Sequence, residues 1–345
     1  MQTQYDPQRR NNRRRATHSF SAVWAKAALL FGFIAIAGLT NSQEVHVVPQ
    51  TSSLLTKTPD LEPASSPGHF FRIKVDLVLV PVTVTDHVGR SVTGLDAENF
   101  QIYEDKERQI VKHLSTEDAP LSLGIIFDTS GSMAGKIVRA REAIGEFMNT
   151  ANLEDEFFMI SFSDRPKEVS DFTSSPEDIL SRLALSVPKG RTALLDAIYL
   201  GLTRMRQAQY ARKALLIISD GGDNNSRYTE RDIRSMVRES DTMIYGIGIF
   251  DRSFPTSEEL AGPALLTEIS EETGGRTFTI DNPNDLGAVA AQIGVELRNQ
   301  YVLSYRPAIQ RIDGKWHKIK VKLLLPKGLP PLTVHARKGY YAHSE

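Results

Sequence analysis

The fold is decided by the stretch LSLGIIFDTSGSMAGKIVRAREAIGEFMNT, residues 121–150. It opens on a mostly apolar run, residues 121–127, which is typical of a strand buried on both faces of a sheet. It closes on residues 136–150, where Ile137, Ala140, Ile144 and Phe147 recur at helical spacing and predict an amphipathic helix. A polar turn with one carboxylate and three hydroxyls, residues 128–132, joins the two. A strand, a turn and a helix in this order are the repeating unit of an α/β fold.

The same alternation continues to residue 299. Strands are predicted at 155–163, 167–173, 213–219, 242–250 and 276–280, and helices at 177–185, 193–207, 230–240, 264–273 and 285–299. Cap residues Ser175 and Thr229 precede two of these helices. We therefore predict a doubly wound, mostly parallel, Rossmann-like sheet of six strands, in which 155–163 and 167–173 form an antiparallel hairpin.

Segments with a strand pattern stand on both sides of this region. Residues 70–118 and 300–345 alternate branched and polar side chains between turns. Each flank alone offers too few strands for a stable unit. We therefore predict one small β-sandwich-like domain built from both flanks, with an α/β domain of residues 119–299 inserted between them.

The first 42 residues predict export. Five arginines precede the apolar run of residues 27–39, which is the order of a signal peptide. Because the apolar character extends back to residue 23, interrupted by Lys26, an uncleaved N-terminal membrane anchor is the alternative. Residues 43–69 are rich in Pro, Ser and Thr and predict a linker. The remainder is expected in the periplasm, at the cell surface or secreted.

Composition excludes several classes of function. Beyond residue 42 the chain holds 35 basic and 41 acidic residues, so its surface is a poor match for nucleic acid. The absence of cysteine excludes disulfides, thiolate metal sites and a lipid-anchored cysteine. The eight histidines form no zinc-binding sequence motif.

Three chemistries use a polar turn such as residues 128–132. A phosphate-binding P-loop is disfavoured because Gly131 stands one residue too close to Lys136 and Ile137 occupies the Ser/Thr position. An aspartic protease is disfavoured because the turn leads into a helix and no second Asp-Thr-Ser/Gly turn follows. A divalent cation remains, since the side-chain oxygens of Asp128 and of the two serines that follow at alternate positions can converge on one point.

Two further loops are predicted to reach the same point. Ligands of open α/β sheets bind beyond the carboxyl ends of the strands, where the strand order reverses, which in the order 3-2-1-4-5-6 lies between strands one and four. Asp128 ends the first predicted strand and Asp220 follows the fourth. Thr192 lies between them at a predicted helix start, where it could instead cap that helix. Arg191, Asp223 and Asn224 are expected at the rim as solvated loop residues.

Together these loops resemble the metal-ion-dependent adhesion site of von Willebrand factor A (VWFA) domains. Asp128, Ser130 and Ser132 match the family's D-x-S-x-S motif, Thr192 its separate threonine and Asp220 its second aspartate, in the family's order. The resemblance covers roughly residues 119–299. The flanking stretches VDLVLVPVTVTD, GLDAENFQIYED and RKGYYA are similar to those of an exported bacterial group, the VWFA-related acidobacterial proteins.

The resemblance implies a protein-binding function without catalysis. It implies Mg²⁺, or Mn²⁺ or Ca²⁺ in its place, held by the five residues with one coordination position open to an Asp or Glu carboxylate of a partner protein. Cell adhesion or envelope assembly would follow. Two alternatives stay open: a hydrolase that uses a metal-bound water, although the loops offer no separate general base, and a structural protein in which the metal only stabilises loops. Neither the partner nor the oligomeric state is indicated.

Overall fold

The structure is a computed structural model that describes residues 77–342, except 221, 250–256, 309–312 and 326–329. The predicted signal peptide or anchor of residues 1–42 and the predicted linker of residues 43–69 lie outside the described residues. Within the described part, no helix combines the length and the apolar character needed to cross a membrane.

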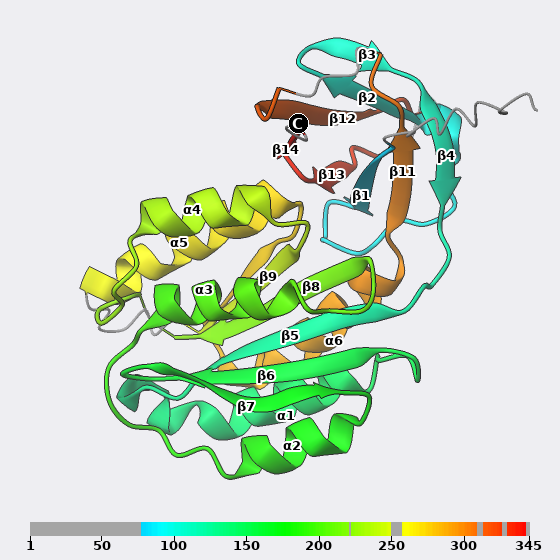
Figure 1. Cartoon of the computed structure of the whole chain (residues 1–345). Coiled ribbons are helices and arrows are strands. Elements are labelled where there is room, and N and C mark those ends of the chain that lie inside the picture. Colours follow the sequence, from blue (N-terminus) through cyan, green and yellow to red (C-terminus); the bar gives the residue numbers. More distant parts are fainter. Residues whose placement is uncertain (1–76, 221, 250–256, 309–312, 326–329, 343–345) are drawn as a thin grey trace, which may run out of the picture. The chain divides into compact units, whose positions relative to one another are not determined.

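A six-stranded sheet forms the centre of the α/β region (Figure 1). Its strands are β5 (Leu121–Asp128), β6 (Glu156–Phe162), β7 (Pro166–Thr173), β8 (Arg212–Ser219), β9 (Met243–Ile249) and β10 (Thr277–Ile280). Their spatial order is β10-β9-β8-β5-β6-β7, and only the β6 and β7 pair is antiparallel. The predicted doubly wound order, including the hairpin, is confirmed.

Helices cover both faces of this sheet. One face packs against α1 (Ile137–Met148), α2 (Pro176–Ala184) and α6 (Leu286–Arg298), and the other against α3 (Leu194–Met205), α4 (Glu230–Glu239) and α5 (Ser257–Thr273). The predicted caps Ser175 and Thr229 accept hydrogen bonds from the third residue of α2 and α4, respectively. The predicted start of the fifth helix at residue 264 is wrong, because α5 begins earlier and runs through Pro263.

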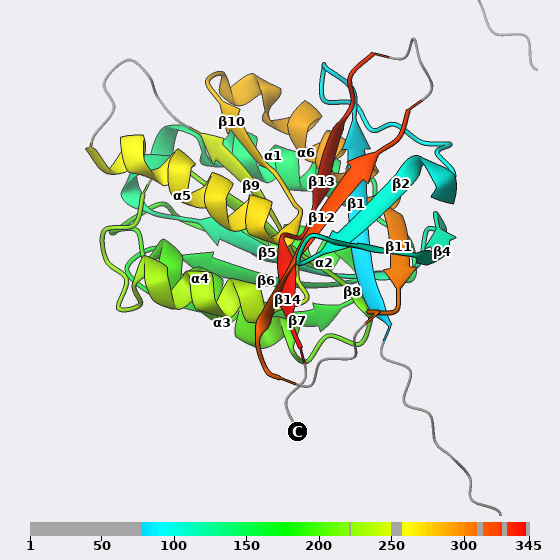
Figure 2. The same cartoon turned by 90° about the horizontal axis from the view of Figure 1, so that it is seen from above.

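The flanking segments form two four-stranded sheets. One has the order β13-β1-β11-β4 and the other β14-β12-β2-β3. The strands are β1 (Val78–Thr85), β2 (Phe100–Glu104), β3 (Glu107–Gln109), β4 (Val111–Ser115), β11 (Tyr301–Tyr305), β12 (Trp316–Leu323), β13 (Thr333–Ala336) and β14 (Gly339–Tyr341). Each sheet combines strands from both ends of the described region, as the blue-to-cyan and orange-to-red ribbons of Figure 2 show. Side chains of both sheets share one apolar core, as predicted for a domain built from two flanks.

Polar contacts join the flanking sheets to the α/β region. Gln292 in α6 donates from Nε2 to the backbone oxygen of Gly89, at 2.8 Å, in the turn that follows β1. Arg337 after β13 donates to Asp241, which precedes β9, at 2.8 Å. The two regions are therefore fixed to each other at separate points along α6 and β9.

Candidate metal centre

The predicted ligand loops meet at the carboxyl edge of the central sheet. Asp128 is the last residue of β5, and Asp220 directly follows β8. These two strands are parallel neighbours, and the chain leaves β5 toward β6 on one side while β8 lies on the other. The topology therefore brings both carboxylates to the point at which ligands of such sheets bind.

Hydrogen bonds connect four of the five predicted ligands. The Asp128 carboxylate accepts at Oδ1 from the backbone nitrogen of Ser130, at 2.7 Å. The hydroxyl oxygens of Ser130 and Ser132 lie 3.0 Å apart, and Ser132 Oγ donates to Asp220 Oδ1 at 2.8 Å. Asp128 and Asp220 are fully buried and Ser130 is 1% exposed. The structure thus places two carboxylates and two hydroxyls in one continuous, mostly buried network.

Burial of Asp128 makes its charge unfavourable. Loss of solvation raises the pKa of this carboxyl to about 6, and the neighbouring charge of Asp220 acts in the same direction. Hydrogen bonds from Ser219, whose Oγ donates to Oδ2 at 2.6 Å, and from Ser130 oppose the shift without cancelling it. A cation between the two carboxylates would relieve both the lost solvation and the repulsion.

Thr192 lies in a loop that is attached to both carboxylate-bearing loops. In this loop, the backbone nitrogen of Lys189 donates to the oxygen of Thr129 at 2.9 Å. The oxygen of Gly190 accepts from the backbone nitrogen of Gly131 at 3.0 Å. Thr192 itself is 5% exposed, and its backbone nitrogen donates to Asn224 Oδ1 at 2.9 Å. The helix-cap alternative is wrong, because Ala193 occupies the N-cap position of α3. The hydrogen bonds found among the described residues do not link Thr192 to the other four side chains, so its role as a ligand remains a prediction.

Two of the residues predicted to be solvated at the rim also have a structural role: Asn224 is exposed and Asp223 is half-buried. Asp223 Oδ1 accepts from the backbone nitrogen of Leu195 in the first turn of α3, at 3.2 Å. The Asn224 side chain holds Thr192 as described, and its backbone nitrogen donates to the Thr192 oxygen at 3.0 Å. Arg191 is exposed, as expected. The two acceptors therefore fix the position of the Thr192 loop against the Asp220 loop.

Sequence reasoning missed one member of the site. Lys136 Nζ donates to Asp220 Oδ2 at 2.7 Å, and the lysine side chain is only 17% exposed. In the sequence, Lys136 is notable only because its position is close to that of a P-loop lysine. Its position directly before α1, at the end of the polar turn, was the available signal, since that position is next to the carboxyl edge of the sheet.

The donor set fits the predicted cation. Every predicted ligand offers oxygen, and hard oxygen donors suit Mg²⁺, Mn²⁺ and Ca²⁺ better than softer metals. Two carboxylates would balance the charge of such an ion, and together with three neutral hydroxyls they would supply five donors, one fewer than the six oxygen ligands that Mg²⁺ prefers. The oxygen network of Asp128, Ser130, Ser132 and Asp220 is therefore chemically suited to a divalent cation that accepts a further oxygen ligand.

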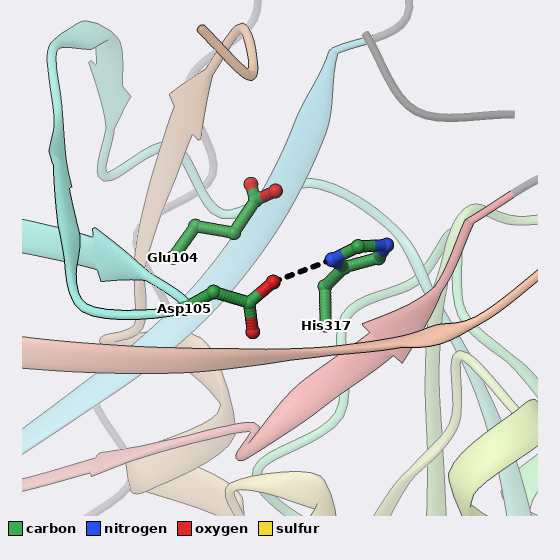
Figure 3. A group of neighbouring side chains, drawn as sticks. All are labelled: Glu104, Asp105 and His317. Carbon is green, nitrogen blue, oxygen red and sulfur yellow. Dashed lines mark hydrogen bonds and ion pairs between the residues drawn. The ribbon is translucent and has the colours of Figure 1, made fainter. Parts of the chain in front are cut away.

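A second group of candidate ligands lies in the flanking sheets (Figure 3). Glu104, Asp105 and His317 come together because β2 pairs with β12. His317 places Nδ1 2.7 Å from Asp105 Oδ2 and Nε2 3.2 Å from Asp313 Oδ1, while Glu104 accepts from the Tyr305 hydroxyl at 2.7 Å. When the imidazole is protonated, each of its two ring nitrogens can donate a hydrogen bond to one of these two aspartates. We therefore interpret this cluster as a buried ion pair, and no sequence motif could have revealed residues 212 positions apart.

This ion pair predicts a pH-dependent contribution to stability. Burial of His317 disfavours its charged form, but the hydrogen bonds with Asp105 and Asp313 outweigh burial and raise its pKa. A raised pKa stabilises the fold below the pKa of the unfolded chain, and that stabilisation is lost as pH rises through the folded-state value. His317→Asn should therefore lower the free energy of unfolding by about 2 kcal/mol near pH 5.5 and by clearly less near pH 9. Urea unfolding of both proteins at the two pH values tests this, and an equal difference at both would contradict it.

Comparisons with solved structures return α/β domains of low sequence identity. A von Willebrand factor type A protein from Catenulispora acidiphila is 12% identical, with 79% of this chain and 75% of that chain covered and a TM-score of 0.46. The conserved hypothetical protein BatB from Bacteroides thetaiotaomicron is 17% identical, with 51% and 98% covered and a TM-score of 0.42. The PilB minor pilin from Streptococcus sanguinis is 15% identical, with a TM-score of 0.42. The match covers 52% of this chain and 61% of the pilin, less than two thirds of its length.

No curated protein matches the chain significantly. A protein-family model described as "von Willebrand factor type A domain" matches residues 123–222. This segment runs from β5 to the loop after β8 and includes all five predicted ligands. The chain therefore contains a von Willebrand factor type A domain.

Proposed function

We propose that this protein is an exported, metal-dependent protein-binding module. In this proposal Asp128, Ser130, Ser132, Thr192 and Asp220 hold Mg²⁺, directly or through water, and a partner protein supplies an Asp or Glu carboxylate as a further ligand. The observation that carries the proposal is the hydrogen-bonded network of two buried carboxylates and two serine hydroxyls at the carboxyl edge of the sheet. Export rests on the arginine-rich, then apolar, N-terminal sequence.

The composition of the site supports binding of an anionic partner. When bound, the ion would supply a Lewis acid with a coordination position to fill, because the five proposed ligands are fewer than the six oxygens that Mg²⁺ prefers. The protein's own residues position it: Ser130 and Ser132 on the turn after β5, and Asp220 on the loop after β8. A partner carboxylate is the hard, anionic oxygen ligand that such a site would favour.

Exposed apolar side chains in the segment that leads into the Thr192 loop support a partner of protein size. Leu185 and Val187 are 81% and 69% exposed, and they lie in the segment between α2 and α3. Two residues farther on, Lys189 donates its backbone nitrogen to Thr129, inside the metal-binding turn. Exposed apolar side chains of this kind are found at the cores of protein interfaces, so this segment offers a partner protein a surface to pack against.

The alternative of a metal-assisted hydrolase has one observation in its favour. A pKa of about 6 would allow Asp128 to act as a general base. However, Asp128 is fully buried, and both of its carboxylate oxygens already accept hydrogen bonds. No histidine takes part in the network among the described residues. Binding without catalysis is therefore the better supported function.

Capture of partner proteins tests the proposal. The full chain is immobilised and exposed to an envelope extract in Mg²⁺ and again in EDTA. We expect proteins to be retained in Mg²⁺, released by EDTA, and not retained by Ser132→Ala, which loses the hydroxyl between Ser130 and Asp220. The matched control is Ser181→Ala, which removes an exposed hydroxyl on α2 and should behave like the unmodified protein.

Each other outcome supports a different function. Retention that survives both EDTA and Ser132→Ala would contradict metal-dependent binding. If Mg²⁺ raises the melting temperature but no protein is retained, the metal only stabilises loops. Turnover of a hydrolysable ester or phosphate that depends on Mg²⁺ and on Ser132 would favour the hydrolase.

A further inference from the structure

Lys136 lies against one of the two carboxylates of the proposed metal site. Its ammonium donates to Asp220 Oδ2 at 2.7 Å, while Ser132 donates to the other oxygen of the same carboxylate. Asp220 is fully buried, and the Lys136 side chain is 17% exposed. Both carboxylate oxygens of Asp220 therefore have a partner from the protein itself.

The position of Lys136 in the chain is electrostatically unusual. It follows the short 3₁₀ helix Gly131–Gly135 and occupies the N-cap of α1, a helix of 12 residues. The N-terminus of a helix carries partial positive charge, so a cation there is unfavourable on its own. The ion pair with Asp220 offsets this repulsion. The lysine thus depends on the carboxylate that a metal ion would also need.

The charges in the site make the two cations competitors. Asp128 and Asp220 together supply two negative charges, and Lys136 neutralises one of them at 2.7 Å from Asp220. A divalent ion that approaches Asp220 meets the ammonium at short range, where charge repulsion is strong because the surroundings are buried. The ion can gain full access to Asp220 only when the ammonium moves away.

We propose that Lys136 is a built-in competitor for the divalent cation, and that its displacement from Asp220 sets the metal affinity of the site. The inference rests on the proposed function, because it assumes that the site binds Mg²⁺. It adds a control element: the protein keeps its own cation on Asp220 until the divalent ion is concentrated enough to displace it. Removing the ammonium should then tighten metal binding.

Calorimetric titration with Mg²⁺ at constant ionic strength tests this directly. Lys136→Met keeps most of the side-chain length and removes the charge, so it should bind Mg²⁺ at least about tenfold more tightly than the unmodified protein. Lys189→Met is the matched control, because Lys189 is exposed on the neighbouring loop, where it contributes a backbone hydrogen bond to Thr129. It removes the same charge nearby and should change the affinity by less than about twofold. An affinity of Lys136→Met that equals or falls below that of the unmodified protein would overturn the proposal.

A second measurement uses the unmodified protein and decides the question even if Lys136→Met does not fold. Amine acylation by an N-hydroxysuccinimide ester is followed by mass spectrometry at Lys136 and Lys189, with and without Mg²⁺. If the ion displaces the ammonium, labelling of Lys136 should rise with Mg²⁺ while that of Lys189 stays constant. Unchanged or reduced labelling of Lys136 would contradict displacement.

Failure of this inference can be distinguished from failure of the proposed function. Equal Mg²⁺ affinity in the unmodified protein and Lys136→Met, with partner capture intact, would remove the role of Lys136 and leave the binding module standing. Absence of Mg²⁺ binding in both proteins would overturn both proposals together.

Discussion

Asp128→Asn should abolish Mg²⁺-dependent capture of partners and, at the same time, stabilise the metal-free protein near neutral pH. The first effect follows from the loss of a charged ligand, and we expect the Mg²⁺ affinity to fall by more than about 100-fold, beyond the loss usual for residues outside the ligand shell. The second follows from the cost of a buried charge. Asparagine keeps the size of the side chain and an oxygen that can accept from the Ser130 nitrogen.

The size of the stability gain follows from the pKa of Asp128. Burial raises this pKa from 3.8 in the unfolded reference to about 6 in the folded protein. The folded state therefore holds the proton more tightly, and the protein loses stability as pH rises from below 3.8 to above about 6. At pH values near 7 the loss amounts to at most about 3 kcal/mol. The asparagine variant should be free of it.

Urea unfolding in EDTA measures this effect. The variant should be more stable than the unmodified protein near pH 7, and the two should converge toward pH 4, where the carboxyl is protonated in the folded state. Asp285→Asn, at an exposed side chain that makes no capping hydrogen bond to α6, is the control and should change stability by less than about 1 kcal/mol. A less stable Asp128→Asn near neutral pH would mean that the hydrogen bonds from Ser219 and Ser130 outweigh burial, contrary to the pKa argument.

The sheet and the position of the site could be predicted because both depend on local patterns. Buried parallel strands appear in sequence as apolar runs, and the rules for connecting them leave few possible orders. Once the order is known, Asp128 and Asp220 must meet, since both end neighbouring parallel strands. Pairing of the two flanks followed from the same kind of argument, because neither contained enough strands alone.

Contacts between distant side chains could not be predicted in this way. Lys136 and Asp220 are 84 positions apart, and their ion pair depends on where the polar turn returns to the sheet edge. Asn224 is an exposed loop residue, as expected, but its side chain also accepts a hydrogen bond from the backbone nitrogen of Thr192. His317 finds Asp105 only through the register of β2 against β12. Each of these depends on three-dimensional register, which hydrophobic periodicity does not encode.

The second large effect is expected at a buried ion pair between α6 and the start of β10. Arg276 Nη1 donates to Glu296 Oε2 at 2.9 Å, and the Tyr245 hydroxyl donates to Oε1 at 3.1 Å. The Glu296 side chain is fully buried and that of Arg276 is 19% exposed. Burial raises the pKa of Glu296, against the opposing charge of Arg276. Its ionised form therefore depends on the Arg276 guanidinium and on the Tyr245 hydroxyl.

Glu296→Ala should lower the free energy of unfolding by about 3–5 kcal/mol, because it leaves a mostly buried guanidinium and a buried hydroxyl without their acceptor. Urea unfolding near pH 7 measures the loss. The control is Glu142→Ala, which breaks a pair with Arg139 in which both side chains are 52% exposed. That pair is solvated, so its loss should cost less than about 1 kcal/mol.

A double variant separates a charge effect from a packing effect. If the loss in Glu296→Ala comes from the uncompensated charge of Arg276, then replacing both partners by apolar residues, Glu296→Leu with Arg276→Met, should recover most of the stability, since buried ion pairs are often replaceable in this way. If the double variant is as unstable as Glu296→Ala, the loss comes instead from the Tyr245 hydroxyl, which has lost its Glu296 acceptor in both variants. Neither substitution touches the carboxyl edge of the sheet. The folded fraction of both variants should therefore bind Mg²⁺ as the unmodified protein does.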